Sequence, residues 1–250
     1  MLKILLSGCS GTMGGVVAKI ANETEGISIV AGYDLRHNDA LSFPIYSDIC
    51  KCAEMPDVII DFSNPAALEG LLSFAVKNKI PVVVATTGLS EAEHSFLRAA
   101  SEKIPVFFSP NMSIGINLLI DLVKNAAKVL GDDFDMEIIE KHHNKKLDAP
   151  SGTALYIADS INDVFGNSKK YIYDRHAERK RREKCEIGIH SIRGGTIAGE
   201  HSVLFAGNDE IIEINHAAVS KSIFATGALK ASVFIFGKPP GLYGMNDMLK

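Results

Sequence analysis

The stretch LKILLSGCSGTMGG, residues 2–15, decides the fold of the first half of the chain. Its apolar run over residues 2–7 predicts a buried strand, and apolar side chains at helical spacing just beyond it predict a helix. Gly8, Gly11 and Gly14 lie at the junction. A glycine turn here lets the main chain approach a pyrophosphate, whose charge the helix N-terminus stabilises. The stretch therefore indicates a dinucleotide site, although a tight turn without ligand would look similar.

An acidic residue after the next strand strengthens this interpretation. Residues 27–33 predict a second strand, and Asp34 follows it. In dinucleotide-binding folds a carboxylate about 20 residues beyond the glycines accepts the ribose hydroxyls of adenosine. Asp34 should repel a 2′-phosphate and so favour NADH, whereas Arg36 could neutralise that phosphate and admit NADPH. The predicted cofactors are NADH, NADPH or both.

Short apolar runs alternate with helical stretches in the first 110 residues. The runs at 58–61, 81–84 and 105–108 are apolar on both faces, as is typical of strands inside a parallel sheet. Ligands collect at the carboxyl ends of such strands, so the segments after two of them are predicted to border the nicotinamide. Ordinary capped turns fit these segments equally well: Ala85, Thr86, Thr87, Ser109, Pro110, Asn111 and Met112.

The pattern changes beyond residue 110. A helix, a strand and a second helix are followed by three alternating runs up to residue 216, with glycine-rich turns between them. This order predicts an antiparallel or mixed sheet covered on one face by helices. A last helix is expected over 220–236, and the pattern does not show on which domain it packs. The fold class is therefore α/β, with a Rossmann-type parallel sheet domain and an α+β second domain.

The chemistry-bearing residues are densest in EKHHNKKLDAPSGTA, residues 140–154. The segment joins a strand to a helix that starts near Ser151. The main-chain N–H groups and hydroxyls of Ser151, Gly152 and Thr153 are therefore predicted to bind an anion such as a carboxylate. Lys146 and its neighbouring lysine add positive charge. This pattern suits a small dianionic substrate.

Two adjacent histidines, His142 and His143, lie in the same segment. On an extended chain their side chains point to opposite faces, which argues against joint chelation of one metal ion, and no metal is expected. An imidazole titrates near neutrality and suits proton transfer. One of these histidines is therefore a candidate acid or base.

These residues together resemble the 4-hydroxy-tetrahydrodipicolinate reductase family, also called dihydrodipicolinate reductase, of bacterial lysine biosynthesis. The resemblance is carried by the glycine turn and by the pattern H-H-x-x-K-x-D-A-P-S-G-T-A from residue 142. Further matches are Arg193-Gly194-Gly195, Gly199-Glu200-His201 and the tail from Gly241, so the resemblance covers essentially the whole chain. One departure is Leu35, where relatives that accept NADPH often carry arginine.

The resemblance implies roles for individual residues. His142 is similar to the family's proton donor or acceptor, and Lys146 to its proton-donating lysine. The implied substrate contacts are His143, Gly152 and Thr153, to which the predicted anion site adds Ser151. The implied cofactor contacts are Gly8, Cys9, Ser10, Gly11, Thr12, Met13, Asp34, Ala85, Thr86, Thr87, Ser109, Pro110, Asn111 and Met112.

The resemblance also implies an architecture and a reaction. Residues 1–110 and 217–250 would form the dinucleotide-binding domain, and residues 111–216 a substrate-binding domain whose sheet builds a homotetramer. The expected reaction is the NAD(P)H-dependent reduction of 4-hydroxy-tetrahydrodipicolinate to tetrahydrodipicolinate. Domain closure would carry the substrate to the nicotinamide.

Two alternatives remain open at this stage. Another two-domain amino-acid or semialdehyde dehydrogenase would share the nucleotide half but lack the carboxylate site at residues 151–153. A dinucleotide-sensing regulator without turnover is the second, supported by the basic stretch at residues 175–184. Glutamates interrupt that stretch, and the whole chain has a net charge of −4, so no nucleic-acid binding is expected.

The remaining composition bears on location. Four cysteines are few for 250 residues and are expected to be reduced thiols. No apolar run approaches membrane-spanning length or forms a signal peptide, so neither membrane association nor export is predicted, and the protein is expected to be cytoplasmic. Cys9 lies in the glycine turn, where a helix N-terminus would lower its pKa.

Overall fold

The computed structural model describes residues 1–250, which divide into two compact units. Unit 1 contains Met1–Ile114 and Lys221–Lys250, and unit 2 contains Gly115–Ser220. Each junction lies four residues beyond the boundary expected from the sequence pattern. At the second junction the reason is that the last strand of unit 2 continues to Ala218.

Unit 1 is built on one parallel sheet with the strand order β12-β6-β5-β4-β1-β2-β3. The strands are β1 (Leu2–Ser7), β2 (Ile27–Tyr33), β3 (Ile45–Tyr46), β4 (Val58–Asp61), β5 (Val82–Val84), β6 (Pro105–Phe108) and β12 (Gly241–Tyr243). The predicted Rossmann-type parallel sheet is confirmed. The edge strands β3 and β12 were not predicted, because two or three residues carry no readable alternation.

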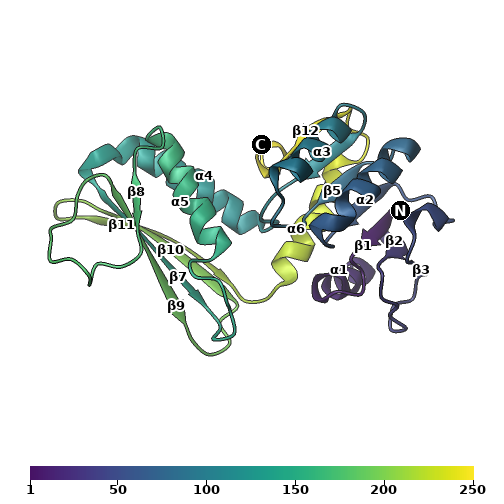
Figure 1. The fold of residues 1–250 in the computed structure, drawn as a ribbon, viewed down its shortest axis with the longest axis horizontal. Helices are drawn as coiled ribbons and strands as arrows, with labels where there is room; N and C mark the ends of the chain where they lie inside the picture. The colour runs from purple at the N-terminus through teal and green to yellow at the C-terminus, as the bar shows by residue number, and fades with distance from the viewer. The chain divides into compact units, whose positions relative to one another are not determined.

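Helices cover both faces of this sheet (Figure 1). They are α1 (Thr12–Glu23), α2 (Pro65–Asn78), α3 (Glu91–Ser101), α6 (Ser222–Ile235) and α7 (Met245–Met248), with a 3₁₀ turn η1 (Ile49–Lys51). α1 and α6 pack into one apolar core, and α2 and α3 into the other. The last helix of the sequence pattern, α6, therefore belongs to unit 1. Gly227 allows its close packing, because a Cβ there would lie 1.8 Å from the carbonyl oxygen of Met112.

Unit 2 contains a five-stranded mixed sheet with the order β11-β10-β7-β9-β8. Its strands are β7 (Asp135–His142), β8 (Lys170–Ile172), β9 (Glu186–Arg193), β10 (Gly199–Ala206) and β11 (Ile211–Ala218). β7 runs antiparallel to β10 and parallel to β9, and lies between them. Of the two sheet types left open by the sequence, the mixed one is observed.

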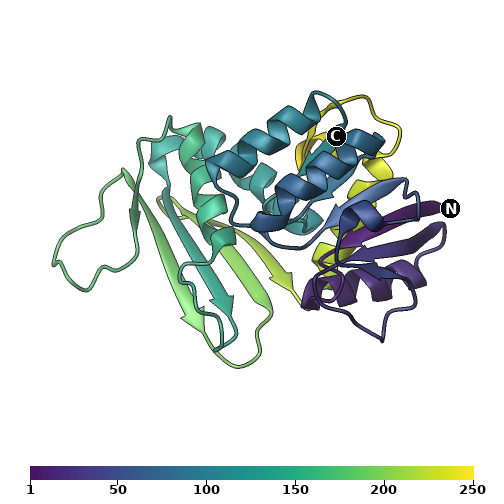
Figure 2. The ribbon, with the colours of Figure 1, turned by 45° about the vertical axis from the view of Figure 1, so that its right-hand side comes forward.

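The helices of unit 2 cover one face of its sheet (Figure 2). They are α4 (Ile114–Leu130) and α5 (Gly152–Val164), with a 3₁₀ turn η2 (Gly131–Asp133). Alternate residues of β7 are buried beneath them, namely Met136, Ile138, Glu140 and His142. The residues between these, such as Glu137, point to the face that carries no helix. None of the helices is long and apolar enough to cross a membrane.

Candidate active site

The glycine turn of unit 1 has no room for side chains. Gly8 has a φ of 76°, and a Cβ there would lie 2.5 Å from the carbonyl oxygen of Phe62. A Cβ at Gly14 would lie 2.3 Å from the carbonyl oxygen of Gly8. Gly11 precedes α1 without a side-chain cap, and no acidic residue lies in the first turn. The N–H groups and dipole at this helix end therefore suit a pyrophosphate.

Asp34 is held against this turn. Its carboxylate accepts hydrogen bonds from the main-chain N–H groups of Ser10, at 3.0 Å, and Arg36, at 2.9 Å. Each carboxylate oxygen keeps a second lone pair for a ribose hydroxyl. The Arg36 side chain is exposed, with its Nε 3.8 Å from Asp34.

A cavity of about 650 Å³ in unit 1 joins these features. Its lining residues are Gly8, Gly11, Tyr33, Asp34, Leu35, Arg36, Phe62, Ser63, Asn64, Ala66 and Ala67. Five of these lining residues were not predicted from the sequence: Phe62, Ser63, Asn64, Ala66 and Ala67. Their position directly after the buried strand β4, beside β1, was the available signal. The residues of this unit fit an adenine dinucleotide.

The Cys9 side chain cannot contact a ligand in this unit. It is fully buried, and a Cβ built at Gly32 would lie 2.5 Å from its sulfur. Burial raises the pKa of the Cys9 thiol. The expectation of a lowered pKa was wrong, because desolvation outweighs the field of the helix N-terminus. Only the main chain of Cys9 is available to a cofactor.

The segments after β5 and β6 lie at the same sheet edge as the glycine turn, since all these strands are parallel. Thr86 is buried, and its hydroxyl donates to the carboxylate of Asp61 at 2.7 Å. Burial raises the pKa of Asp61. The Ser109 hydroxyl donates to the carbonyl of Asn111 at 2.7 Å. These hydroxyls stabilise the loops, while Thr87 and Pro110 are exposed.

In unit 2 a buried carboxylate gathers the residues at the end of β7. Glu140 has 0% of its side chain exposed. Arg193 donates two hydrogen bonds to it, at 2.8 and 2.7 Å, and His142 Nδ1 lies 2.6 Å from Oε2. The main-chain N–H of Ser151 donates to it at 3.1 Å. Burial alone would raise the pKa of Glu140, but hydrogen bonds from Arg193 and its other neighbours outweigh burial and lower it to about 2.

A second histidine adjoins this group. The His201 ring packs edge-on against the His142 ring, with centroids 5.4 Å apart, and its Nε2 lies 3.1 Å from Ser151 Oγ. Burial, assisted by the nearby His142, lowers the pKa of His201 to about 4. His201 is therefore a neutral hydrogen-bonding group near neutral pH.

The loop 143–151 carries the other predicted residues. Lys146 forms an ion pair with Asp148 at 2.8 Å, and Arg193 donates to the Asp148 carbonyl at 2.7 Å. Ser151 is buried and caps α5 by accepting from the N–H of Ala154 at 3.1 Å, so its hydroxyl is engaged within the protein. Gly152, at the first turn of α5, is exposed.

The remaining predicted contacts lie nearby in the sequence. Thr153 is half-buried in the first turn of α5, and His143 is half-buried with its Nδ1 enclosed and without a hydrogen-bond partner. His142 and Ser151 thus both contact the Glu140 carboxylate. Arg193 connects this carboxylate to the loop that carries Lys146, because it also binds the Asp148 carbonyl.

Three residues of this group had no individual role in the sequence analysis: Glu140, Arg193 and His201. The signal for Glu140 was its i, i+2 spacing to His142, which places both side chains on one face of a strand. Arg193 and His201 come from other strands, and their approach follows only from the sheet pairing.

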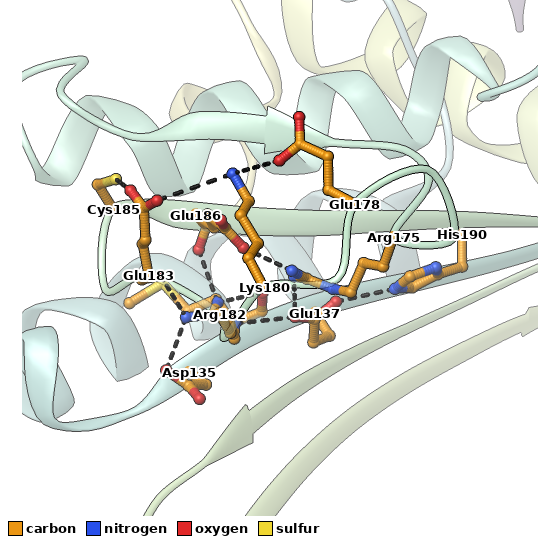
Figure 3. A network of polar contacts seen from close by, with 11 residues as sticks. Asp135, Glu137, Arg175, Glu178, Lys180, Arg182, Glu183, Cys185, Glu186 and His190 are labelled. Carbon is orange, nitrogen blue, oxygen red and sulfur yellow. Dashed lines mark hydrogen bonds and ion pairs between the residues drawn. The ribbon is translucent and has the colours of Figure 1, made fainter.

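The basic stretch at residues 175–184 lies in the connection between β8 and β9, and two of its arginines bind acidic residues of the sheet (Figure 3). Arg175 donates to Glu137 and Glu186, and Arg182 to Asp135 and Glu137. Their charge is therefore partly neutralised within the chain. No three His, Cys, Asp or Glu side chains gather closely enough to hold a metal ion.

The parallel sheet with its glycine turn, joined in one chain to a second domain with a histidine–carboxylate site, is typical of the class of two-domain nucleotide-dependent oxidoreductases. Two family models then narrow the class. "Dihydrodipicolinate reductase, N-terminus" matches residues 2–112, and "Dihydrodipicolinate reductase, C-terminus" matches residues 115–249. The chain belongs to the dihydrodipicolinate reductase family and is an enzyme of the reductase type.

Individual relatives agree with this assignment. A 4-hydroxy-tetrahydrodipicolinate reductase from Caldanaerobacter subterraneus subsp. tengcongensis is 54% identical, with 100% of this chain and 99% of the relative covered. One from Clostridium novyi is 49% identical over the same shares. The solved dipicolinate-bound dihydrodipicolinate reductase from Paenisporosarcina sp. TG-14 has a TM-score of 0.81 and 24% identity, covering 99% of both chains, and it supports the fold.

Proposed function

We propose that this enzyme reduces 4-hydroxy-tetrahydrodipicolinate to tetrahydrodipicolinate with NADH or NADPH, in bacterial lysine and diaminopimelate biosynthesis. The observation that carries the proposal is the 54% identity to a reductase of this name over the whole chain. The predicted residues at the end of β7 and the start of α5 fit a small ring with two carboxylates. Four free cysteines suit a reducing compartment, and the cytoplasm is the proposed location.

The residues of unit 2 would bind the substrate through its carboxylates. Main-chain N–H groups of Gly152 and Thr153 lie at the positive end of α5, where an anion is stabilised. Ser151 holds that helix end in place through its cap, and His143 offers an imidazole. This arrangement would orient the ring so that its reacting carbon is presented correctly.

The residues that handle charge would be His142 and Lys146. The substrate would first lose its 4-hydroxyl as water, which leaves a conjugated cyclic imine, and the reduced nicotinamide, when bound, supplies the hydride to C4 of this ring. Negative charge then develops on the ring nitrogen, where His142, in the form that carries a proton on each of its two nitrogens, would donate the proton that is not held by Glu140, and Lys146 would supply a cationic field. Lys146 lies beside Asp148, whose pKa it lowers through their hydrogen bond, and a second carboxylate from the substrate could replace that partner.

The cofactor residues of unit 1 would act mainly through their main chain. Gly8, Cys9, Ser10, Gly11, Thr12 and Met13 would surround the pyrophosphate, and Asp34 the adenosine ribose. Ala85, Thr86, Thr87, Ser109, Pro110, Asn111 and Met112 would border the nicotinamide. Asp34 favours NADH, and the exposed Arg36 side chain can swing to a 2′-phosphate, so both nucleotides should be used.

We further propose a homotetramer assembled through the helix-free face of the unit 2 sheet. That face and its edge expose apolar side chains, including Ile192 and Ile211. Light scattering coupled to size exclusion should give the mass of four chains. A monomer at micromolar concentration would refute this part of the proposal.

The decisive experiment is a coupled assay in which aspartate semialdehyde, pyruvate and the preceding synthase generate the unstable substrate. Oxidation of NADH and of NADPH is followed separately by absorbance. The proposal expects turnover that depends on the synthase. Turnover with aspartate semialdehyde alone would instead support a semialdehyde dehydrogenase, and no turnover with either nucleotide would refute the proposal.

A further inference from the structure

β7 places one glutamate on each of its faces, and each glutamate binds a histidine and at least one arginine. On the helix-free face Glu137 receives Arg175, Arg182 and His190 (Figure 3). On the helix-covered face Glu140 receives Arg193 and His142. Only the second histidine adjoins the proposed substrate site.

Glu140 is in an unusual place for a carboxylate. Its neighbours on the same face, Met136 and Ile138, are apolar and fully buried. An ionised carboxylate in such surroundings is costly unless it is paired and hydrogen-bonded. The bidentate contact from Arg193 and the N–H of Ser151 supply those partners, so Glu140 stays ionised when His142 is neutral.

An ionised carboxylate only accepts hydrogen bonds, which fixes the role of its histidine partner. The 2.6 Å contact between Glu140 and His142 therefore requires the proton on Nδ1. The other ring nitrogen, Nε2, points toward Gly199, where a built Cβ would lie 3.1 Å away. Glycine at position 199 therefore lets the His142 ring keep this orientation without a crowded contact at Nε2.

We propose that Glu140 is a positioning residue that fixes the His142 ring with its proton on Nδ1, so that Nε2 is the nitrogen presented to the substrate. The inference rests on the proposed function for the identity of the reaction. Arg193 supports the same arrangement, because it binds Glu140 and also the Asp148 carbonyl in the Lys146 loop. A single buried carboxylate thereby sets the orientation of the acid–base residue.

The kinetic test compares Glu140→Gln with the matched control Glu137→Gln. Both changes remove a charge from the same strand and from an arginine–histidine cluster. We expect Glu140→Gln to lower kcat by about 10²-fold, with a much smaller change in KM for the substrate and unchanged NADH affinity. The control should keep kcat within about twofold, at an oligomeric state matched by light scattering. Equal losses in both variants would overturn the inference, as would a normal kcat in Glu140→Gln.

A double variant separates positioning from general damage to the fold. If Glu140 acts through His142, then adding Glu140→Gln to His142→Gln should lower kcat by less than about threefold further. A further loss of about 10²-fold would show that the two residues act independently and would overturn the inference.

The wild-type protein offers a test that needs no stable Glu140 variant. Nitrogen-15 spectra of labelled histidines at alkaline pH report which ring nitrogen carries the proton, and His142→Gln identifies the signal of His142. We expect a proton on Nδ1 and a bare Nε2; a proton on Nε2 would overturn the inference. Failure of wild-type turnover would refute the proposed function, whereas these spectra test the Glu140 contact whatever the substrate.

Discussion

The two faces of β7 carry the same three residue types and differ in burial. The Glu140 side chain is 0% exposed and its partner His142 is 11% exposed, whereas Glu137 is 21% and His190 39% exposed. In both cases burial would raise the pKa of the carboxyl, but hydrogen bonds from the partners outweigh it and lower the pKa.

The surroundings explain what each cluster can do. Glu137 attaches a surface connection to the sheet through Arg175 and Arg182. Glu140 instead joins a histidine to a helix N-terminus and to the lysine-bearing loop. A glutamate–histidine pair is a candidate for catalysis where a binding site for the substrate's charge adjoins it, and of these two pairs only Glu140 and His142 lie beside the proposed one.

The largest expected difference between the two clusters is at the histidines. His142→Gln should lower kcat by about 10²-fold or more, because it removes the proposed proton donor. NADH affinity, measured by fluorescence titration, should not change, since the nucleotide residues lie in unit 1. His190→Gln is the matched control and should keep wild-type turnover. A near-normal rate in His142→Gln would remove this residue from the acid–base role.

Substituting the arginines Arg193 and Arg182 should change kcat/KM by a smaller factor than substituting the histidines. Arg193→Lys replaces a two-pronged contact with a single point charge, so we expect kcat/KM to fall by about tenfold. Arg182→Lys should leave kcat/KM unchanged and instead lower the denaturant midpoint, because Arg182 bridges Asp135 and Glu137. If both variants lost only stability, Arg193 would have no special role.

The buried titratable groups on the helix-covered face of the unit 2 sheet should also affect how the free energy of unfolding depends on pH. The pKa of His201 is lowered to about 4, so between pH 6.5 and 4 the unfolded chain binds the additional proton. This contribution to the unfolding free energy is complete above pH 6.5 and is lost as the pH falls to 4. Its slope is at most about 1.4 kcal/mol per pH unit.

Denaturant titrations at several pH values, with His201→Gln beside the wild type, measure that slope. The variant should have a flatter profile in this window. For Glu140 the corresponding window lies between pH 4.5 and 2, and Glu140→Gln should flatten it, because the lowered pKa makes the unfolded chain bind the proton first. Unchanged profiles in both variants would contradict the burial of His201 and the hydrogen bonds to Glu140.

The smallest effects are expected at two glycines that face the clusters. A Cβ at Gly199 would lie 3.1 Å from His142 Nε2, so Gly199→Ala should displace the ring slightly and lower kcat by about threefold. A Cβ at Gly188 would lie 1.6 Å from Glu137 Oε2, so Gly188→Ala should cost about 1 kcal/mol of stability and leave kcat unchanged. The opposite pattern would mean that the roles of the two faces are reversed.

Much of the fold was readable from the sequence, because local patterns determine it. Short apolar runs predicted the strands β1, β4, β5 and β6, and apolar residues at helical spacing predicted the helices α2 and α4. The placement of β7 between β9 and β10 was not readable, because strand neighbours depend on contacts far apart in the chain.

The candidate site was likewise predictable where local motifs determine it and not where tertiary contacts do. The glycine turn, Asp34 and the segment from His142 to Thr153 were visible because each is a short motif with its own chemistry. The burial of Ser151 and its contact with His201, and the desolvation of Cys9, depend on tertiary packing and could not be seen locally.

The most direct measurement is a crystal structure of the protein with NADH and dipicolinate, the ligand of the solved relative. We expect the ligand's carboxylates to contact the N–H groups of Gly152 and Thr153. We also expect His142 Nε2 to face the ring beside the nicotinamide, with Glu140 still bound to Nδ1. A dicarboxylate bound away from residues 142–153, or beside His190 on the other face of β7, would contradict it.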